Sequence, residues 1–157
     1  MRNDDDIAKI IREIKMVQIK LDQNLTKILF KFDLTSSQAP ILKMIVEHEK
    51  EGKELQQKEI EEFFYLKNPT VTGILDRLES KKYIVRKISK EDRRKRCIIP
   101  TKKGREISNN SDKYLNEYRQ KLVKGVNKEE FEACANIINK MVTNIKLMDE
   151  ENKLKSE

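Results

Sequence analysis

Basic side chains are concentrated in the middle of this 157-residue chain. The segment from Lys67 to Arg105 holds fourteen Lys and Arg residues against four Asp and Glu residues, whereas the whole chain has a formal net charge of +7. The segments on either side are therefore slightly acidic in sum. A dense positive charge on one short segment is typical of a surface that binds the phosphate groups of a nucleic acid.

Other residue types that could do chemistry are scarce. His48 is the only histidine, and Cys97 and Cys134 lie far apart without a CxxC spacing, so we expect no metal site and no disulfide framework. The chain also lacks a nucleophile–base pairing and a glycine-rich phosphate loop. We therefore expect a protein that is not an enzyme and needs no cofactor. Both thiols are interpreted as small packing residues, with a redox role for either left open.

Helical patterns precede the basic segment. Apolar residues recur at helical spacing over residues 7–32, which predicts one long amphipathic helix. Thr35 and Gln38 form a capping box at the start of a second helix. Apolar residues from Leu55 to Phe64 predict a short third helix. These helices lead into the basic segment.

The basic segment itself combines a helix with a hairpin. Asn68 at the cap and Pro69 at the first helical position predict the start of a fourth helix, whose outer face is polar and basic. Two short helices joined by a tight turn match a helix-turn-helix. After Lys82 the apolar period changes to two, which predicts a β-hairpin with a strongly charged tip. The fold class is therefore mainly α with a small β-hairpin wing, a winged helix-turn-helix.

Two more helical patterns follow, and the second repeats at seven-residue intervals from Phe131. With 37% hydrophobic residues, the chain is lean for a self-sufficient core of this size. We therefore predict a homodimer. Residues 1–157 would form a single domain, with dimerisation helices at 5–34 and 103–150 and a DNA-binding lobe at 35–102.

Four motifs stand in order between residues 68 and 104. They are Asn68-Pro-Thr-Val-Thr-Gly-Ile-Leu-Asp-Arg-Leu-Glu79, Tyr83-Ile-Val-Arg86, Asp92-Arg-Arg94 and Ile98-Ile-Pro-Thr-Lys-Lys-Gly104. Together they resemble the MarR family of winged helix-turn-helix transcriptional regulators. Two residues depart from the family pattern: Lys82 stands where Gly is usual, and Pro100 replaces the usual Leu. Both lie at the edges of predicted elements, so the fold is expected to be kept.

The resemblance implies which residues bind double-stranded DNA. On the fourth helix they are Asn68, Thr70, Thr72, Gly73, Arg77 and Lys81, and on the wing they are Asp92, Arg93, Arg94 and Lys95. Short hydroxyl side chains suit base edges and thymine methyl groups in the major groove, and Arg77 suits a phosphate. The alternative is that the threonines merely favour the helix start and that Arg77 is solvated.

For the wing, the resemblance implies that Arg94 enters the minor groove while Asp92 braces the hairpin tip. A narrow minor groove has an enhanced negative potential, which attracts an inserted guanidinium group. Asp92 is otherwise an ordinary turn residue. The remaining cations of the tip can bind phosphates or be solvated.

The function expected from the resemblance is that of a homodimeric repressor on a pseudo-palindromic operator, released by a small-molecule effector. Phe30, Phe32, Tyr114 and Tyr118 are candidates for an effector pocket, although core packing is the simpler role for each. A different reading is a winged-helix protein-interaction module without specific DNA binding. The N-terminus lacks the features of a signal peptide and no apolar stretch is long enough for a membrane span, so a cytoplasmic location is expected.

Overall fold

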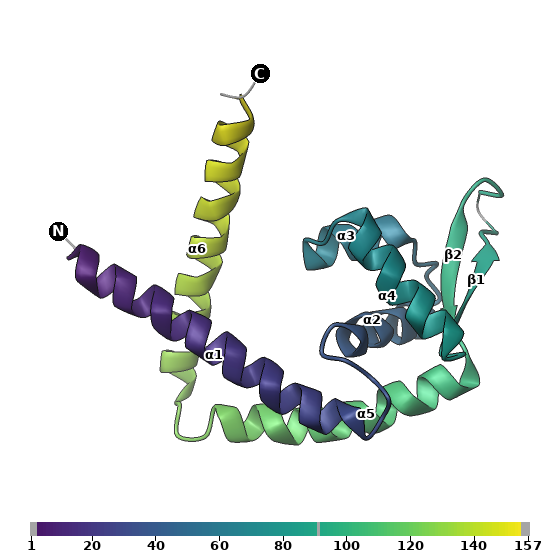
Figure 1. Ribbon diagram of the computed structural model, residues 1–157, viewed down its shortest axis with the longest axis horizontal. Coiled ribbons are helices and arrows are strands. Elements are labelled where there is room, and N and C mark those ends of the chain that lie inside the picture. Colours follow the sequence, from purple (N-terminus) through teal and green to yellow (C-terminus); the bar gives the residue numbers. More distant parts are fainter. Residues whose placement is uncertain (1–2, 91, 155–157) are drawn as a thin grey trace. The chain divides into compact units, whose positions relative to one another are not determined.

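The structure is a computed structural model that describes residues 3–90 and 92–154. The elements follow in the order α1 (Asp4–Phe30), α2 (Gln38–Lys50), α3 (Gln57–Phe64), α4 (Asn68–Ser80), β1 (Ile84–Ile88), β2 (Arg96–Pro100), α5 (Lys102–Leu122) and α6 (Lys128–Leu154) (Figure 1). The chain divides into two compact units, Met1–Tyr118 and Arg119–Glu157. The prediction of a mainly helical protein with one β-hairpin is confirmed.

The first unit holds the hydrophobic core. Helices α2 and α4, the hairpin and the segment before α3 turn their apolar residues toward one another, and most of these side chains are almost fully buried. The central members are Ile41, Leu42, Ile45, Leu55, Ile60, Val71, Leu75, Leu78, Tyr83 and Ile84. This cluster is a common core for the helix-turn-helix and the hairpin. Full burial of each such side chain stabilises the folded state by about 1.5–3 kcal/mol.

The start of α2 follows the predicted capping box. The N–H of Gln38 donates to Thr35 Oγ1 at 3.2 Å, and the N–H of Thr35 donates to Gln38 Oε1 at 3.2 Å. The two bonds satisfy backbone donors that the first helical turn leaves unpaired. Gln38 is also buried, so its amide lies inside the lobe.

Two predicted helix starts are displaced in the structure. Helix α3 begins at Gln57, because Leu55 instead pairs with Ile98 in an antiparallel bridge, with the Ile98 N–H 2.8 Å from the Leu55 carbonyl oxygen. Helix α4 begins at Asn68, so Lys67 occupies the cap position predicted for Asn68. The Asn68 amide does not cap the helix, because it donates to Glu61 Oε1 at 2.7 Å.

The hairpin is a two-stranded antiparallel sheet in which Ile84 lies opposite Pro100 and Ile88 opposite Arg96. Pro100 is the last residue of β2, where a missing N–H is tolerated. Lys82 has a φ of 61°, in the left-handed region that glycine adopts most easily. The turn between α4 and β1 therefore keeps a glycine-like conformation in spite of the lysine.

The Thr101 and Gly104 positions of the last motif join the hairpin to α5. Thr101 Oγ1 donates to the Lys82 carbonyl oxygen at 2.7 Å and accepts the N–H of Gly104 at 3.0 Å, so it caps the helix. A Cβ atom on Gly104 would overlap the backbone carbonyl of Tyr83. Glycine is therefore needed at this position for a close approach of helix and turn.

The second unit consists mainly of α6. Gly125, with a φ of 86°, lies in the turn that precedes it. The N–H of Asn127 donates to Glu130 Oε2 and the N–H of Glu130 donates to Asn127 Oδ1, each at 2.9 Å. This reciprocal pair is a capping box, and it sets the start of α6 at the break that the sequence predicts.

Candidate nucleic-acid interface

The first turn of α4 is held against α3 by side-chain hydrogen bonds. Gln57 Nε2 donates to Thr72 Oγ1 at 2.8 Å and to Glu61 Oε1 at 3.0 Å, and Glu61 Oε1 also accepts from Asn68. Because the Thr72 hydroxyl accepts from Gln57, its own proton is directed elsewhere and can be donated to an acceptor on a ligand. Asn68 and Thr72 thus lie in a fixed arrangement at one end of α4.

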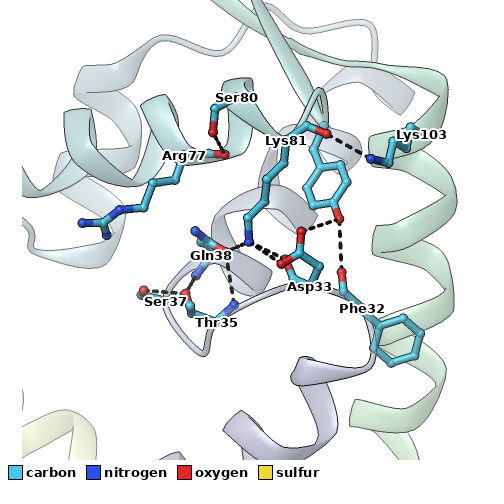
Figure 2. A network of polar contacts seen from close by, with 10 residues as sticks. Phe32, Asp33, Thr35, Ser37, Gln38, Arg77, Ser80, Lys81 and Lys103 are labelled. Carbon is cyan, nitrogen blue, oxygen red and sulfur yellow. Dashed lines mark hydrogen bonds and ion pairs between the residues drawn. The ribbon is translucent and has the colours of Figure 1, made fainter.

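Thr70, Gly73 and Arg77 follow each other on one face of α4, since their spacings of three and four residues bring them to the same side of a helix. Thr70 and Arg77 are exposed, and a Cβ atom added at Gly73 would meet no atom within 4 Å. The Arg77 guanidinium points away from the neighbouring polar network (Figure 2). This face is open to close approach by another molecule.

Lys81 differs from the other candidates on α4. Its ammonium group donates to the carbonyl oxygen of Asp33 at 2.6 Å, to Asp33 Oδ1 at 3.0 Å and to Gln38 Oε1 at 3.3 Å (Figure 2). The Lys81 side chain is only 25% exposed. The structure therefore gives Lys81 intramolecular partners, and its contact with DNA stays a prediction.

The tip of the wing is organised by Asp92. Its Oδ1 atom accepts the N–H of Arg94 at 3.0 Å and lies 3.3 Å from Arg94 Nε. The N–H of Asp92 in turn donates to Ser89 Oγ at 3.2 Å. The Arg94 side chain is 92% exposed, and Arg93 and Lys95 are exposed beside it. These contacts are those expected of a residue that braces the tip, and the outer nitrogens of Arg94 face solvent.

Arg86 connects the wing to α4, a role that its position in the sequence does not predict. Its guanidinium lies 2.7 Å from Asp76 Oδ1 and 2.9 Å from Glu79 Oε2, while its backbone N–H donates to Glu79 Oε1 at 3.1 Å. The single positive charge of Arg86 offsets part of the negative charge of these two carboxylates next to the open face of α4. The contacts also join β1 directly to α4.

Glu54 anchors the other side of the wing. Its carboxylate accepts a short hydrogen bond from the hydroxyl of Ser89 and another from the N–H of Lys90 at 2.9 Å. The hydrogen bond from Ser89, followed by that from Lys90, lowers the pKa of Glu54 below its ordinary value of 4.5. The loop that follows β1 is thereby tied to the segment between α2 and α3.

This geometry predicts a pH dependence. A carboxyl group whose pKa is lower in the folded state stabilises the fold above its unfolded pKa, and this contribution is lost as the pH falls through the folded pKa. We expect wild type to melt at a higher temperature than Glu54→Gln at pH 7, and the difference to shrink below pH 4.5. Calorimetry across pH 3–7 measures it, and a difference independent of pH would contradict the assigned role of the Glu54 carboxylate.

Two of the four aromatic residues suggested for an effector pocket contact each other. Phe32 and Tyr114 form a tilted pair with ring centroids 5.4 Å apart, and Lys31 Nζ lies 5.9 Å from the Tyr114 ring. Phe30 is 84% exposed, and Tyr118 is half-buried. An open groove lies elsewhere in the first unit, between the middle of α1 and the residues Ser36 and Ser37. An effector site stays a prediction.

The remaining candidates for chemistry are the two thiols and the imidazole of His48. Cys97 is buried in β2 and Cys134 is exposed on α6. His48 Nδ1 lies 3.0 Å from the Met44 carbonyl oxygen. Within residues 3–90 and 92–154, we find no cluster of three side chains suited to a metal ion and no helix both long and apolar enough to span a membrane.

The helix-turn-helix of α3 and α4, followed at once by the β1–β2 hairpin, defines this chain as a winged helix-turn-helix protein. Residues 32–95 match the model of the MarR family. Together with the solved structures described next, this match confirms the resemblance of the chain to the MarR family of winged-helix transcription regulators.

Three solved structures illustrate the similarity. The transcription regulator MarR from Oenococcus oeni PSU-1 is 28% identical, with a TM-score of 0.74 over 85% of this chain and 98% of that one. MepR from S. aureus in complex with DNA is 27% identical, with a TM-score of 0.78 over 84% and 93%. The transcriptional regulator SlyA, at 23% identity, shares the fold, with a TM-score of 0.76 over 87% of this chain and 93% of its own.

Proposed function

We propose that this protein is a sequence-specific DNA-binding repressor that acts as a homodimer in the cytoplasm. The observation that carries the proposal is the pairing of an open helix face with an exposed, braced arginine on one rigid lobe. Thr70, Gly73 and Arg77 form the face, and Arg94 stands at the wing tip. MepR, which has a similar fold, has been solved in complex with DNA, and this supports the proposal.

The proposed binding mode assigns a role to each part of the lobe. Helix α4 enters the major groove, where Thr70 and Thr72 meet base edges and Gly73 allows the backbone to come close. Asn68 and Arg77 lie at the edges of the groove, where phosphate oxygens are within reach. Arg94 enters the minor groove, and Arg93 and Lys95 bind phosphates. We expect most of the affinity to come from phosphate contacts and most of the selectivity from α4.

The proposal of a dimer is supported by apolar side chains that the monomer leaves exposed. On α1 they are Ile7, Ile10, Ile11, Ile14 and Val17, which follow helical spacing and are 40–54% exposed. On α6, Phe131, Ile138 and Ile145 repeat every seven residues at 47–55% exposure. Apolar stripes of this length are typical of helices that pack against a partner. Residues 5–34 and 103–150 are therefore proposed as the dimerisation helices.

Two-fold symmetry and effector release complete the proposed function. A dimer with two identical lobes fits a pseudo-palindromic operator whose half-sites lie about one helical turn apart, roughly 34 Å. A small molecule that binds better to a dimer with another lobe spacing would lower the DNA affinity. Such an effector would act by changing the distance between the two α4 helices.

The experiment that tests the proposal is selection of duplexes from a randomised pool by the purified full-length chain. We expect enrichment of an inverted repeat and, by light scattering, a complex of two protomers with one duplex. Enrichment without symmetry would contradict the dimeric mode. No enrichment would overturn specific DNA binding and favour the alternative of a protein-interaction module, for which a pull-down is the next measurement.

A further inference from the structure

We propose that Lys81 is a positioning residue for DNA recognition, which acts through Asp33 to hold the direction of α4 relative to the end of α1. This inference rests on the proposed DNA-binding function. It replaces the expected DNA contact of Lys81 with an intramolecular role. It also assigns a function to Asp33, an acidic residue that would otherwise only weaken the binding of a polyanion.

The position of Lys81 in the fold supports this role. Lys81 caps the C-terminal end of α4, and Asp33 lies in the connection between α1 and α2. The ammonium group donates to both the carbonyl oxygen and the carboxylate of Asp33, and to Gln38 Oε1 at the start of α2 (Figure 2). One side chain thus joins the end of α4 to the end of α1 and the beginning of α2.

The donor count of the ammonium group argues against a phosphate contact. A lysine ammonium has three protons, and all three have acceptors within 3.3 Å in this structure. Binding a phosphate would require the Lys81 ammonium group to leave Asp33 and Gln38. Because the Gln38 side chain is buried, its Oε1 atom would then lose a hydrogen-bond donor inside the protein. Arg77, one turn earlier on α4, is exposed and points away from this network (Figure 2).

Neighbouring contacts add to this connection. Asp33 has a φ of 53°, a conformation that aspartate and asparagine tolerate better than most residues. The Tyr83 hydroxyl lies 3.3 Å from the Phe32 carbonyl oxygen and 3.5 Å from Asp33 Oδ2. Lys103 Nζ donates to the Lys81 carbonyl oxygen at 3.2 Å and lies 4.9 Å from the Tyr83 ring centroid. The ends of α1 and α4 and the start of α5 are therefore held together by one polar cluster.

A change at this end of α4 is carried to the end that reads DNA. Thr70 lies eleven residues before Lys81, which is about 16 Å along a helix with a rise of 1.5 Å per residue. Tilting the helix by a few degrees about its C-terminal end therefore moves Thr70 by about 1 Å, more than the roughly 0.5 Å that a preorganised binding site tolerates. Loss of the contact between Lys81 and Asp33 should thus lower selectivity more than general attraction to DNA.

The test compares three single variants and one double variant by fluorescence anisotropy. The probes are a duplex enriched by the wild type from a randomised pool and a scrambled duplex of equal length, each measured across a salt series. Lys81→Met removes the charge, and Asp33→Asn keeps a residue suited to the left-handed backbone conformation. Lys82→Met is the matched control, because Lys82 is the exposed neighbour of Lys81 and the same charge is lost.

We expect Lys81→Met and Asp33→Asn each to reduce the ratio of specific to scrambled affinity about threefold to tenfold. The double variant, which combines these two substitutions, should reduce this ratio no more than the worse single variant does. The salt dependence on the scrambled duplex should match that of Lys82→Met. Asp33→Asn is the decisive variant, because removal of a negative charge alone would leave DNA affinity unchanged or raise it.

Three results would overturn the inference. If Lys81→Met lowered both affinities equally and reduced the salt slope by about 1 while Asp33→Asn had no effect, Lys81 would be a phosphate contact. A lower melting temperature with unchanged selectivity in both variants would show a purely structural contact. A wild type without any selectivity would overturn the proposed function, and the inference with it.

Discussion

Arg94→Ala should weaken binding to the enriched duplex about fivefold to a hundredfold, without changing the mass of the protein in solution. The Arg94 side chain is 92% exposed, and Asp92 holds its Nε atom, so the outer guanidinium nitrogens are already directed outward before DNA arrives. Preorganisation of this kind lowers the entropy lost on binding. The measurement is an anisotropy titration at a fixed salt concentration, together with light scattering.

Arg93→Ala is the matched control for Arg94. It removes the same charge from the adjacent exposed residue, whose side chain forms no hydrogen bond or ion pair with Asp92 in the described part of the chain. We expect a smaller loss, similar on the enriched and on the scrambled duplex, because a phosphate contact carries no sequence information. Unchanged affinity of Arg94→Ala would remove the wing from the proposed binding mode.

Gly104→Ala should destabilise the fold by at least about 3 kcal/mol, the upper part of the range for overpacking. An added Cβ atom would overlap the backbone carbonyl of Tyr83, which cannot move aside as a flexible side chain can. That carbonyl also accepts the N–H of Thr101 at 2.9 Å, so displacing it would disturb the start of α5. For a chain of this size we expect the melting temperature to fall by about 6–12 °C.

Gly73→Ala separates this steric effect from the general effect of replacing a helical glycine. Both glycines lie within helices, but nothing lies within 4 Å of a Cβ atom at Gly73. Since alanine favours helix by about 0.5–1 kcal/mol over glycine, Gly73→Ala should melt at or above the wild-type temperature. A Gly104→Ala variant that melts like the wild type would show that the approach of α5 to Tyr83 is less close than described.

The fold could be predicted in outline because its signals are local. The change of apolar period after Lys82 identifies the hairpin, and the reciprocal pair of Thr35 and Gln38 identifies the start of α2. The prediction that Leu55 belongs to a helix is wrong. Leu55 pairs with Ile98, which lies 43 positions away, and local sequence patterns do not show a partner at that distance. A single apolar residue does not reveal such a partner, since helix and strand both bury it.

The candidate interface was predicted less completely than the fold. Residue type and motif spacing single out the exposed Thr70, Arg77 and Arg94, whose surroundings are mostly solvent. Lys81 has the same residue type but a different environment, because Asp33 approaches it from 48 positions away. The contacts of Arg86 with Asp76 and Glu79 join a strand to a helix, and no periodicity in the sequence encodes that geometry.

The most direct test of the central claim is the salt dependence of binding to the duplex upstream of the protein's own gene, compared with a scrambled duplex. The account predicts that the logarithm of affinity falls linearly and steeply with the logarithm of salt concentration on both duplexes, with tighter binding to the upstream duplex throughout. Equal, weak binding to both duplexes would contradict specific recognition at this site. Weak binding that hardly depends on salt would contradict the assignment of the basic segment to DNA altogether.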